Sequence, residues 1–191
     1  MSVSSIIKTI QNIMRKDAGV DGDAQRIGQL CWMFFLKILD DQDQELELLR
    51  SDYISPVPAE FQWRNWAADP EGITGETLLN FINDELFPKL KELPIEGTNA
   101  PRRLVVRSVF EDALNYMKSG QLIRQVINKV NEIDFNDLSQ RSHFGKVYEQ
   151  ILNELQNAGN AGEYYTPRAV TQFMVNRIDP KPGESLFDPA C

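Results

Sequence analysis

Residues 23–50, DAQRIGQLCWMFFLKILDDQDQELELLR, predict one long helix with a buried apolar face. Asp23 is a residue type that caps a first helical turn, and the apolar residues after it recur at spacings of three and four. The predicted inward face consists of Ile27, Leu30, Cys31, Phe34, Phe35 and Ile38. Lys37 interrupts the longest apolar run, which is far shorter than the roughly 20 residues that span a bilayer. We therefore expect a buried helix of a globular domain.

The second half of this stretch, DDQDQELELL at residues 40–49, is strongly acidic. A run of charges on an amphipathic helix usually forms the face that water covers. We expect the same of this run.

Six further helices are predicted by the same periodicity, near residues 4–17, 75–92, 102–118, 120–133, 140–157 and 166–178. Three of them have clear apolar faces: Ile6, Ile7, Ile10, Ile13 and Met14; Leu122, Ile123, Val126, Ile127, Val130 and Ile133; and Phe144, Val147, Tyr148, Ile151, Leu152 and Leu155. We expect a kink or restart at Pro88, which cannot continue a helical hydrogen-bond ladder. Gly120 is a plausible C-terminal cap of the helix before it. No strand is indicated before residue 184, so the fold class is mainly α.

The segment between the helices at 23–50 and 75–92 has scattered Pro and Gly and no sustained period. We expect an ordered loop that its aromatic residues hold in place. Phe61, Trp63 and Trp66 leave two interpretations open, a platform on which bases stack and loop residues that pack on the core. Only Arg64 accompanies them, which favours the core.

Composition and charge restrict the class of protein. With 191 residues, of which 42% are hydrophobic, the chain can bury one substantial core and an additional piece. The formal net charge of −8 comes entirely from residues 1–100, which contain 9 Lys and Arg against 17 Asp and Glu, whereas residues 101–191 contain 11 of each. A DNA-binding surface usually has a basic excess, so this composition argues against tight DNA binding by the chain alone.

The few metal-ligand and thiol side chains indicate no metal site. Cys31 and Cys191 form no CxxC or other metal spacing, and His143 stands at a predicted helix start, where a structural or capping role is expected. The N-terminus lacks the pattern of a signal peptide. We therefore expect a cytoplasmic protein.

The end of the chain, AGEYYTPRAVTQFMVNRIDPKPGESLFDPAC at residues 161–191, contains the strongest signal for chemistry. Thr166 and Pro167 mark a helix start, a capping hydroxyl followed by a proline at the first helical position. The buried face of that helix is expected to be Val170, Phe173, Met174 and Ile178. Its N-terminal N–H groups suit a carboxylate or phosphate, and two adjacent tyrosines add a flat apolar wall. A small-ligand site and an ordinary helix entry are equally open on these grounds.

The residues that follow favour the ligand site. DPKPGE is a turn, and SLFDPA at residues 185–190 reads as a short buried strand with Asp188 near its C-terminal end, where ligands bind in open α/β sheets. This order of helix, turn and strand resembles the entry to the S-adenosylmethionine domain of N6-adenine DNA methyltransferases. More closely, the chain resembles the N-terminal part of the modification subunit of type I restriction-modification systems. The resemblance also includes RIGQLCWMFFLKILDDQ and VFEDALNYMKSGQLIRQVINKVNEIDF.

The resemblance implies where the cofactor S-adenosylmethionine would bind. In that family, the segment that matches residues 163–168 lies along the cofactor. The implied contacts are Glu163, Tyr164, Tyr165, Thr166, Pro167 and Arg168, with the tyrosines and Thr166 beside the methionine end. The Gly-rich loop and the Asn-Pro-Pro-Phe-type loop that holds a flipped adenine in the family are absent from these 191 residues, so no catalytic residue is expected here.

The resemblance also implies domains and partners. Residues 1–158 would form a helical N-terminal domain, and residues 159–191 the start of a truncated α/β catalytic domain. Family subunits work as two copies around one specificity subunit, which reads the DNA sequence, and a restriction (nuclease) subunit is added for cleavage. Their helical domains lie against double-stranded DNA and against each other. Arg102, Arg103 and Arg107 are the candidates for a basic patch that faces the DNA.

Two other interpretations remain open. In the first, the chain is a helical protein–protein interaction module without methyltransferase activity. In the second, it is part of a stand-alone adenine methylase with its own recognition region. A Gly-rich continuation and an Asn-Pro-Pro-aromatic run after codon 191 would favour an enzyme, whereas a stop codon would favour the module.

Overall fold

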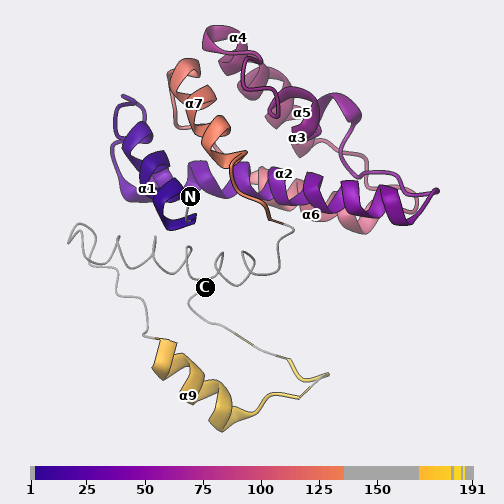
Figure 1. Ribbon diagram of the computed structural model, residues 1–191. Coiled ribbons are helices and arrows are strands. Elements are labelled where there is room, and N and C mark those ends of the chain that lie inside the picture. Colours follow the sequence, from indigo (N-terminus) through magenta and orange to yellow (C-terminus); the bar gives the residue numbers. More distant parts are fainter. Residues whose placement is uncertain (1–2, 136–167, 182, 186, 188–191) are drawn as a thin grey trace. The chain divides into compact units, whose positions relative to one another are not determined.

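The computed structural model describes residues 3–135, 168–181, 183–185 and 187 (Figure 1). The chain divides into two compact units, residues 1–151 and 152–191. All regular elements in the described ranges are helices, and these ranges contain no strand. The predicted mainly α fold class is confirmed.

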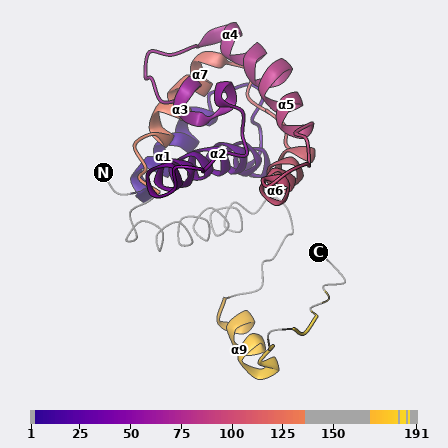
Figure 2. The same ribbon diagram turned by 90° about the vertical axis from the view of Figure 1, so that its right-hand side faces the viewer.

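In the first unit, the other helices pack around the long helix α2 (Asp23–Leu49). α1 (Val3–Met14) and α7 (Gly120–Val130) pack against each other, and α2 lies between α1 and α6 (Ala100–Glu111) in the view of Figure 2. Between α2 and α6 the chain forms η1 (Ala59–Phe61), α3 (Trp63–Trp66), α4 (Gly75–Asn80), the π-helix η2 (Phe81–Leu86) and α5 (Phe87–Lys91). The second unit contains α9 (Arg168–Ile178). The predicted helix at 140–157 and His143 lie outside the described residues.

α1 and α7 confirm their predicted apolar faces. All five residues predicted for the apolar face of α1 are buried. The predicted face at residues 122–133, which includes α7, is also buried except for Leu122, which is partly buried. Both helices keep one side in water, which is the arrangement that a single apolar stripe describes.

α2 is buried around most of its circumference, and its predicted inward face was wrong in part. The fully or nearly buried residues of its first half are Leu30, Trp32, Met33, Phe34 and Leu36, with Ile27, Phe35 and Ile38 partly buried. Cys31, which was expected inside, is exposed. Trp32 meets the ring of Phe87 edge-on, with 5.1 Å between the centroids. Among the described helices, none is both long enough and apolar enough to cross a membrane.

The aromatic residues after α2 belong to the core, as favoured. Phe61, Trp63 and Trp66 are all buried. The indole N–H of Trp63 donates to Asn131 Oδ1 at 2.7 Å, and the Trp66 ring lies 5.3 Å from that of Phe81. Buried rings of this kind offer no surface on which a base can stack.

α4, η2 and α5 follow one another without a break in the helical chain. The expected irregularity at Pro88 takes the form of the π-helical turn just before it. Proline has no N–H to donate, and its ring crowds the carbonyl of the preceding turn, so the ladder must change there. Leu78, Ile82, Leu86 and Leu90 have no exposed surface, so the run keeps one continuous buried face through the irregular turn.

The predicted helix at 102–118 was wrong beyond Glu111, where α6 ends. Residues 113–119 form no helix, because distant side chains take their backbone N–H groups. The N–H of Tyr116 donates to Gln29 Oε1, and those of Lys118 and Ser119 donate to the Asp17 carboxylate, each at 2.9 Å.

Gly120 is not the C-terminal cap that was predicted, since it begins α7. A Cβ atom at this position would lie 1.8 Å from the carbonyl oxygen of Gly75. Glycine is therefore required here because the backbones at the starts of α4 and α7 approach closely.

The second unit confirms the predicted helix and turn but not the predicted buried face. α9 covers the described part of the helix expected at 166–178, and the Glu184 N–H closes a turn on the Lys181 carbonyl. Val170, Phe173, Met174 and Ile178 are 46–68% exposed. The described residues of this unit contain no other element that would cover them. Of the predicted strand at 185–190, only Ser185 and Phe187 are described, and neither is in a strand.

Candidate functional site

The segment predicted to contact the cofactor leads directly into α9. Residues 163–167 and Asp188 lie outside the described residues, and Arg168 is the first residue of α9. The first turn of an α-helix has N–H groups without intrahelical partners. These groups follow directly on the predicted segment, and a helix N-terminus suits a ligand that carries a carboxylate.

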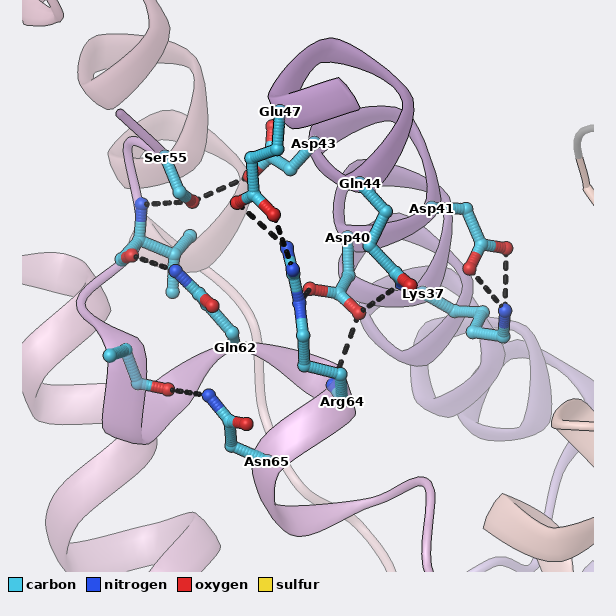
Figure 3. Close-up of polar contacts among 12 residues, drawn as sticks. Lys37, Asp40, Asp41, Asp43, Gln44, Glu47, Ser55, Gln62, Arg64 and Asn65 are labelled. Carbon is cyan, nitrogen blue, oxygen red and sulfur yellow. Dashed lines mark hydrogen bonds and ion pairs between the residues drawn. The ribbon is translucent and has the colours of Figure 1, made fainter. Parts of the chain in front are cut away.

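The acidic end of α2 is only in part the solvated face that was expected, since Glu45 and Glu47 are exposed but three aspartates are not. Asp40, Asp41 and Asp43 are only 4%, 8% and 1% exposed. Each carboxylate has cationic or hydrogen-bonding partners (Figure 3). Most of these partners come from residues 53–64 and 102, which the local pattern of α2 does not reveal.

Arg64, at the start of α3, connects two of these acids. Its Nε lies 2.7 Å from Asp40 Oδ1, and its two terminal nitrogens bind both carboxylate oxygens of Glu47 at 2.6 and 3.1 Å (Figure 3). The Arg64 backbone N–H also donates to Asp40. Burial lowers the pKa of Arg64, but the hydrogen bonds to Glu47 and Asp40 outweigh it and raise the pKa above its ordinary value. The guanidinium therefore fastens α3 onto α2.

Asp43 holds the loop after α2 and the start of α6. Its carboxylate accepts hydrogen bonds from the hydroxyls of Tyr53 and Ser55 and from Arg102, whose guanidinium also lies 5.2 Å from the centre of the Tyr53 ring. Burial raises the pKa of Asp43, although the Ser55 hydrogen bond and the charge of Arg102 act in the opposite direction.

Asp41 pairs with Lys37, one turn earlier on α2. Burial raises the pKa of Asp41, and the hydrogen bond and charge of Lys37 offset this in part. The three acids thus have different principal partners: Arg64 for Asp40, Lys37 for Asp41, and Ser55, Tyr53 and Arg102 for Asp43.

These acids are suited to holding helices together and not to binding a substrate. The cavity beside them, between Asp40, Asp43 and Trp63, has a volume of about 10 Å³. That is about the space one water molecule needs. Within the part of the chain that the structure describes, no group of His, Cys, Asp and Glu side chains is arranged to hold a metal ion.

The three arginines predicted to face DNA are half-buried on α6. Arg102 pairs with Asp43, and Arg103 and Arg107 point terminal nitrogens at the carbonyl oxygens of Pro94 and Leu93, at 3.4 and 3.5 Å. The structure therefore places all three on one helix, where each contacts its own domain.

A second set of basic residues was not singled out from the sequence. The exposed members are Lys8 on α1, Arg15 and Lys16 directly after α1, and Lys118 in the segment that enters α7. The sequence did contain a signal for them, since residues 3–16 and 113–131 have no Asp or Glu. The overall acidity of the first half of the chain hides the local absence of acidic residues.

Two protein families match the chain in succession. The HsdM N-terminal domain family matches residues 3–130, and the N-6 DNA methylase family matches residues 139–191. The first match covers more than half of the chain and includes every element from α1 to α7.

Relatives and solved structures agree with these matches. The type I restriction enzyme EcoEI methylase subunit of Escherichia coli is 64% identical over 191 residues, which are 100% of this chain and 39% of that protein. The crystal structure of a modification subunit of a type I restriction enzyme from Vibrio vulnificus YJ016 has a TM-score of 0.80 and 40% identity, over 98% of this chain and 42% of that one. A chain from a structural study of complex assembly and conformational transition of the type I R-M system has a TM-score of 0.77 and 36% identity, over 97% of this chain and 37% of that one.

The chain thus spans about two fifths of the length of these three proteins. Its helical first unit and the residues that lead into α9 match the two families in the same order along the chain. Because the first family alone accounts for more than half of its residues, the chain belongs to the HsdM family of type I restriction enzyme methylase subunits.

Proposed function

We propose that this chain is the N-terminal part of a type I DNA methyltransferase subunit. The complete subunit transfers a methyl group from S-adenosylmethionine to N6 of adenine, in a DNA site that a specificity subunit selects. The observation that carries the proposal is the succession of the two family matches, together with 64% identity to a methylase subunit over all 191 residues.

The proposed cofactor contacts are Glu163, Tyr164, Tyr165, Thr166, Pro167 and Arg168. When bound, the cofactor supplies an electrophilic methyl group on its sulfonium. The residues on this side offer aromatic rings, hydroxyl groups and the N–H groups at the start of α9. This donor set suits a ligand with an apolar portion and a carboxylate. We place the boundary between the helical domain and the catalytic domain at residues 158 and 159.

The exposed apolar residues of α9 support the assignment to a larger catalytic domain. The side chains of Phe173, Met174 and Ile178 are at least half exposed. Large exposed apolar surfaces mark contact sites. In the complete subunit, the remainder of the catalytic domain covers this face.

The helical domain serves assembly and DNA clamping. Its partners are a specificity subunit, a second modification subunit and a restriction subunit, with double-stranded DNA enclosed in the complex. The likeness to a chain from a study of type I complex assembly supports this role. A cytoplasmic location follows from the DNA substrate.

The proposal is tested by methyl transfer. The full-length subunit, assembled with its specificity subunit, should transfer labelled methyl groups from S-adenosylmethionine to DNA from a strain that lacks the system. Digestion to nucleosides should recover the label as N6-methyladenine, and the subunit without its specificity subunit should transfer none. An assembled complex that binds DNA but transfers no methyl group would contradict the proposal and favour a helical interaction module.

A further inference from the structure

We propose that the exposed face of α1, together with Lys118, is the surface by which the helical domain contacts the phosphate backbone of double-stranded DNA. This inference rests on the proposed function and names the side chains that meet the DNA.

Charge is segregated within the domain. Residues 3–16 contain Lys8, Arg15 and Lys16, residues 113–131 contain Lys118, Arg124 and Lys129, and neither segment contains an Asp or Glu. These two segments include α1 and α7, which pack against each other (Figures 1 and 2). A domain that is acidic overall therefore has one acid-free layer.

Four of the six basic side chains in this layer are exposed, and of these Arg15 donates a hydrogen bond to the exposed Asn12 at 3.1 Å. Arg124 is buried and donates to the carbonyl oxygens of Trp66, Ala67, Asp69 and Ile73, and Lys129 pairs with Glu132. Lys8, Arg15, Lys16 and Lys118 are exposed, and none forms an ion pair with a carboxylate of the described residues.

The exposed basic side chains form a row at one edge of the domain. Lys8 lies on α1, and Arg15 directly follows the last residue of α1, where its N–H still donates to the Gln11 carbonyl. Seven residues at the helical rise separate the two by about 10 Å. That length corresponds to roughly three base-pair steps along the axis of a duplex, at a rise of 3.4 Å per step. Lys118 joins the end of the row, because its N–H donates to Asp17 and its Cγ lies 3.0 Å from a Cβ built on Gly19.

The acid nearest to this row is largely withdrawn from the surface. Asp17 is 4% exposed, and its carboxylate accepts the backbone N–H groups of Gly19, Lys118 and Ser119. Asp21, which is exposed, follows after this turn.

The other exposed residues fit DNA better than they fit a protein partner. α1 exposes Ser5 and Asn12 beside its basic residues, and α7 exposes Gln121 and Gln125. Lys, Arg, Ser, Asn and Gln are side chains that contact DNA phosphates. Protein interfaces instead depend on large apolar anchors and are depleted of Lys. None of the large exposed hydrophobic side chains of the described residues lies on α1 or α7.

The exposed surface of α6 is less polar than that of α1. Leu104 and Val105 are more than half exposed between its arginines, and Arg102 already pairs with Asp43. The basic surface that faces DNA is therefore α1 and not the patch expected from the sequence.

Salt-dependent DNA binding tests the inference. The triple variant Lys8→Gln, Arg15→Gln, Lys16→Gln is compared with the control Arg50→Gln, Lys89→Gln, Lys91→Gln, which removes the same charge elsewhere in the domain. Each is made in the full-length subunit, assembled with its specificity subunit and titrated with a duplex that lacks the recognition sequence. Each lost phosphate contact should make the slope of log binding constant against log salt less negative by about 0.9, hence by about 2.7 for three. The control should keep the wild-type slope.

The possible results separate this inference from the proposed function. Equal slopes in the triple variant and the wild type would overturn the inference, and so would an equal change in the control. A triple variant that binds DNA normally but loses a partner subunit on gel filtration would overturn it in favour of an acidic protein partner. If the slope changes as expected but the wild-type complex transfers no methyl group, the inference stands and the proposed function fails.

Discussion

Arg64 joins α3 to the acidic end of α2 through a carboxylate that is almost fully buried. The side chain of Asp40 is 3% exposed, and that of Arg64 is 25% exposed. Removing one partner of such a pair leaves a charge without compensation in a poorly solvated site. The stability of this corner therefore depends on a residue that the sequence pattern placed in a loop.

Arg64→Ala should lower the free energy of unfolding by about 2 kcal/mol, because Asp40 would lose its cationic partner. Urea denaturation of the chain measures this. Arg50→Ala is the matched control, since Arg50 is exposed at the end of α2, and its effect should stay within about 0.5 kcal/mol. Equal effects of the two substitutions would mean that the Arg64 pair adds nothing to stability.

Asp43 should give the fold an unusual dependence on pH. Because burial raises its pKa above 3.8, the folded state binds the proton more tightly than the unfolded state does. The contribution of Asp43 to stability is then greatest below the unfolded pKa and falls as the pH rises through the folded pKa.

Asp43→Asn removes this titration and nearly preserves the shape of the side chain. The unfolding free energy of the wild type minus that of the variant should decrease as the pH is raised from about 4 to about 7. Chemical denaturation at several pH values provides the measurement. A difference that stays constant or increases with pH would show that Asp43 is not the titrating group described here.

At the scale of elements, the close approach of α4 and α7 depends on the absence of a side chain at Gly120. Gly120→Ala would place a methyl group 1.8 Å from the Gly75 carbonyl oxygen, so the two helices would have to move apart. We expect a loss of about 3 kcal/mol in the free energy of unfolding. Gly22→Ala is the control, because nothing lies within 4 Å of its added Cβ, and it should cost less than about 1 kcal/mol. Similar melting temperatures for the two variants would argue against the close approach.

The elements that could be predicted from the sequence are those whose contacts follow local spacing. α1 and α7 each pack one stripe against the core, so their apolar periodicity identified the buried residues. α2 is surrounded by other elements, and a single stripe therefore missed Trp32, Met33 and Leu36. The end of α6 and the burial of Asp40 and Asp43 depend on Gln29, Arg64 and Arg102, which are distant in sequence.

The candidate cofactor site was predicted by its resemblance to a family, and only its last residue, Arg168, lies in a described element. Physical pattern alone left a ligand site and a plain helix entry equally open. The exposure of the α9 apolar face could not be foreseen, because periodicity identifies an apolar face but not whether another element covers it.

At the scale of the whole molecule, the net charge of −8 conceals a segregated distribution. Several acids are buried in pairs along α2, and the layer of α1 and α7 has no acids. Net charge therefore describes solubility and long-range repulsion, whereas contact with DNA depends on the local surface.

We propose that residues 163–168 form the first wall of an S-adenosylmethionine site. Isothermal titration calorimetry of the full-length subunit with S-adenosylmethionine tests it most directly, with the wild type beside the variant Tyr164→Ala, Thr166→Ala. The control is Thr98→Ala, Leu104→Ala, which alters two exposed residues of the helical domain. We predict that the wild type and the control bind the cofactor equally and that the Tyr164 and Thr166 variant binds at least about tenfold more weakly, equivalent to about 1.4 kcal/mol. Unchanged binding by that variant, with the wild type and the control also binding, would contradict the claim and reduce GEYYTPR to a helix entry.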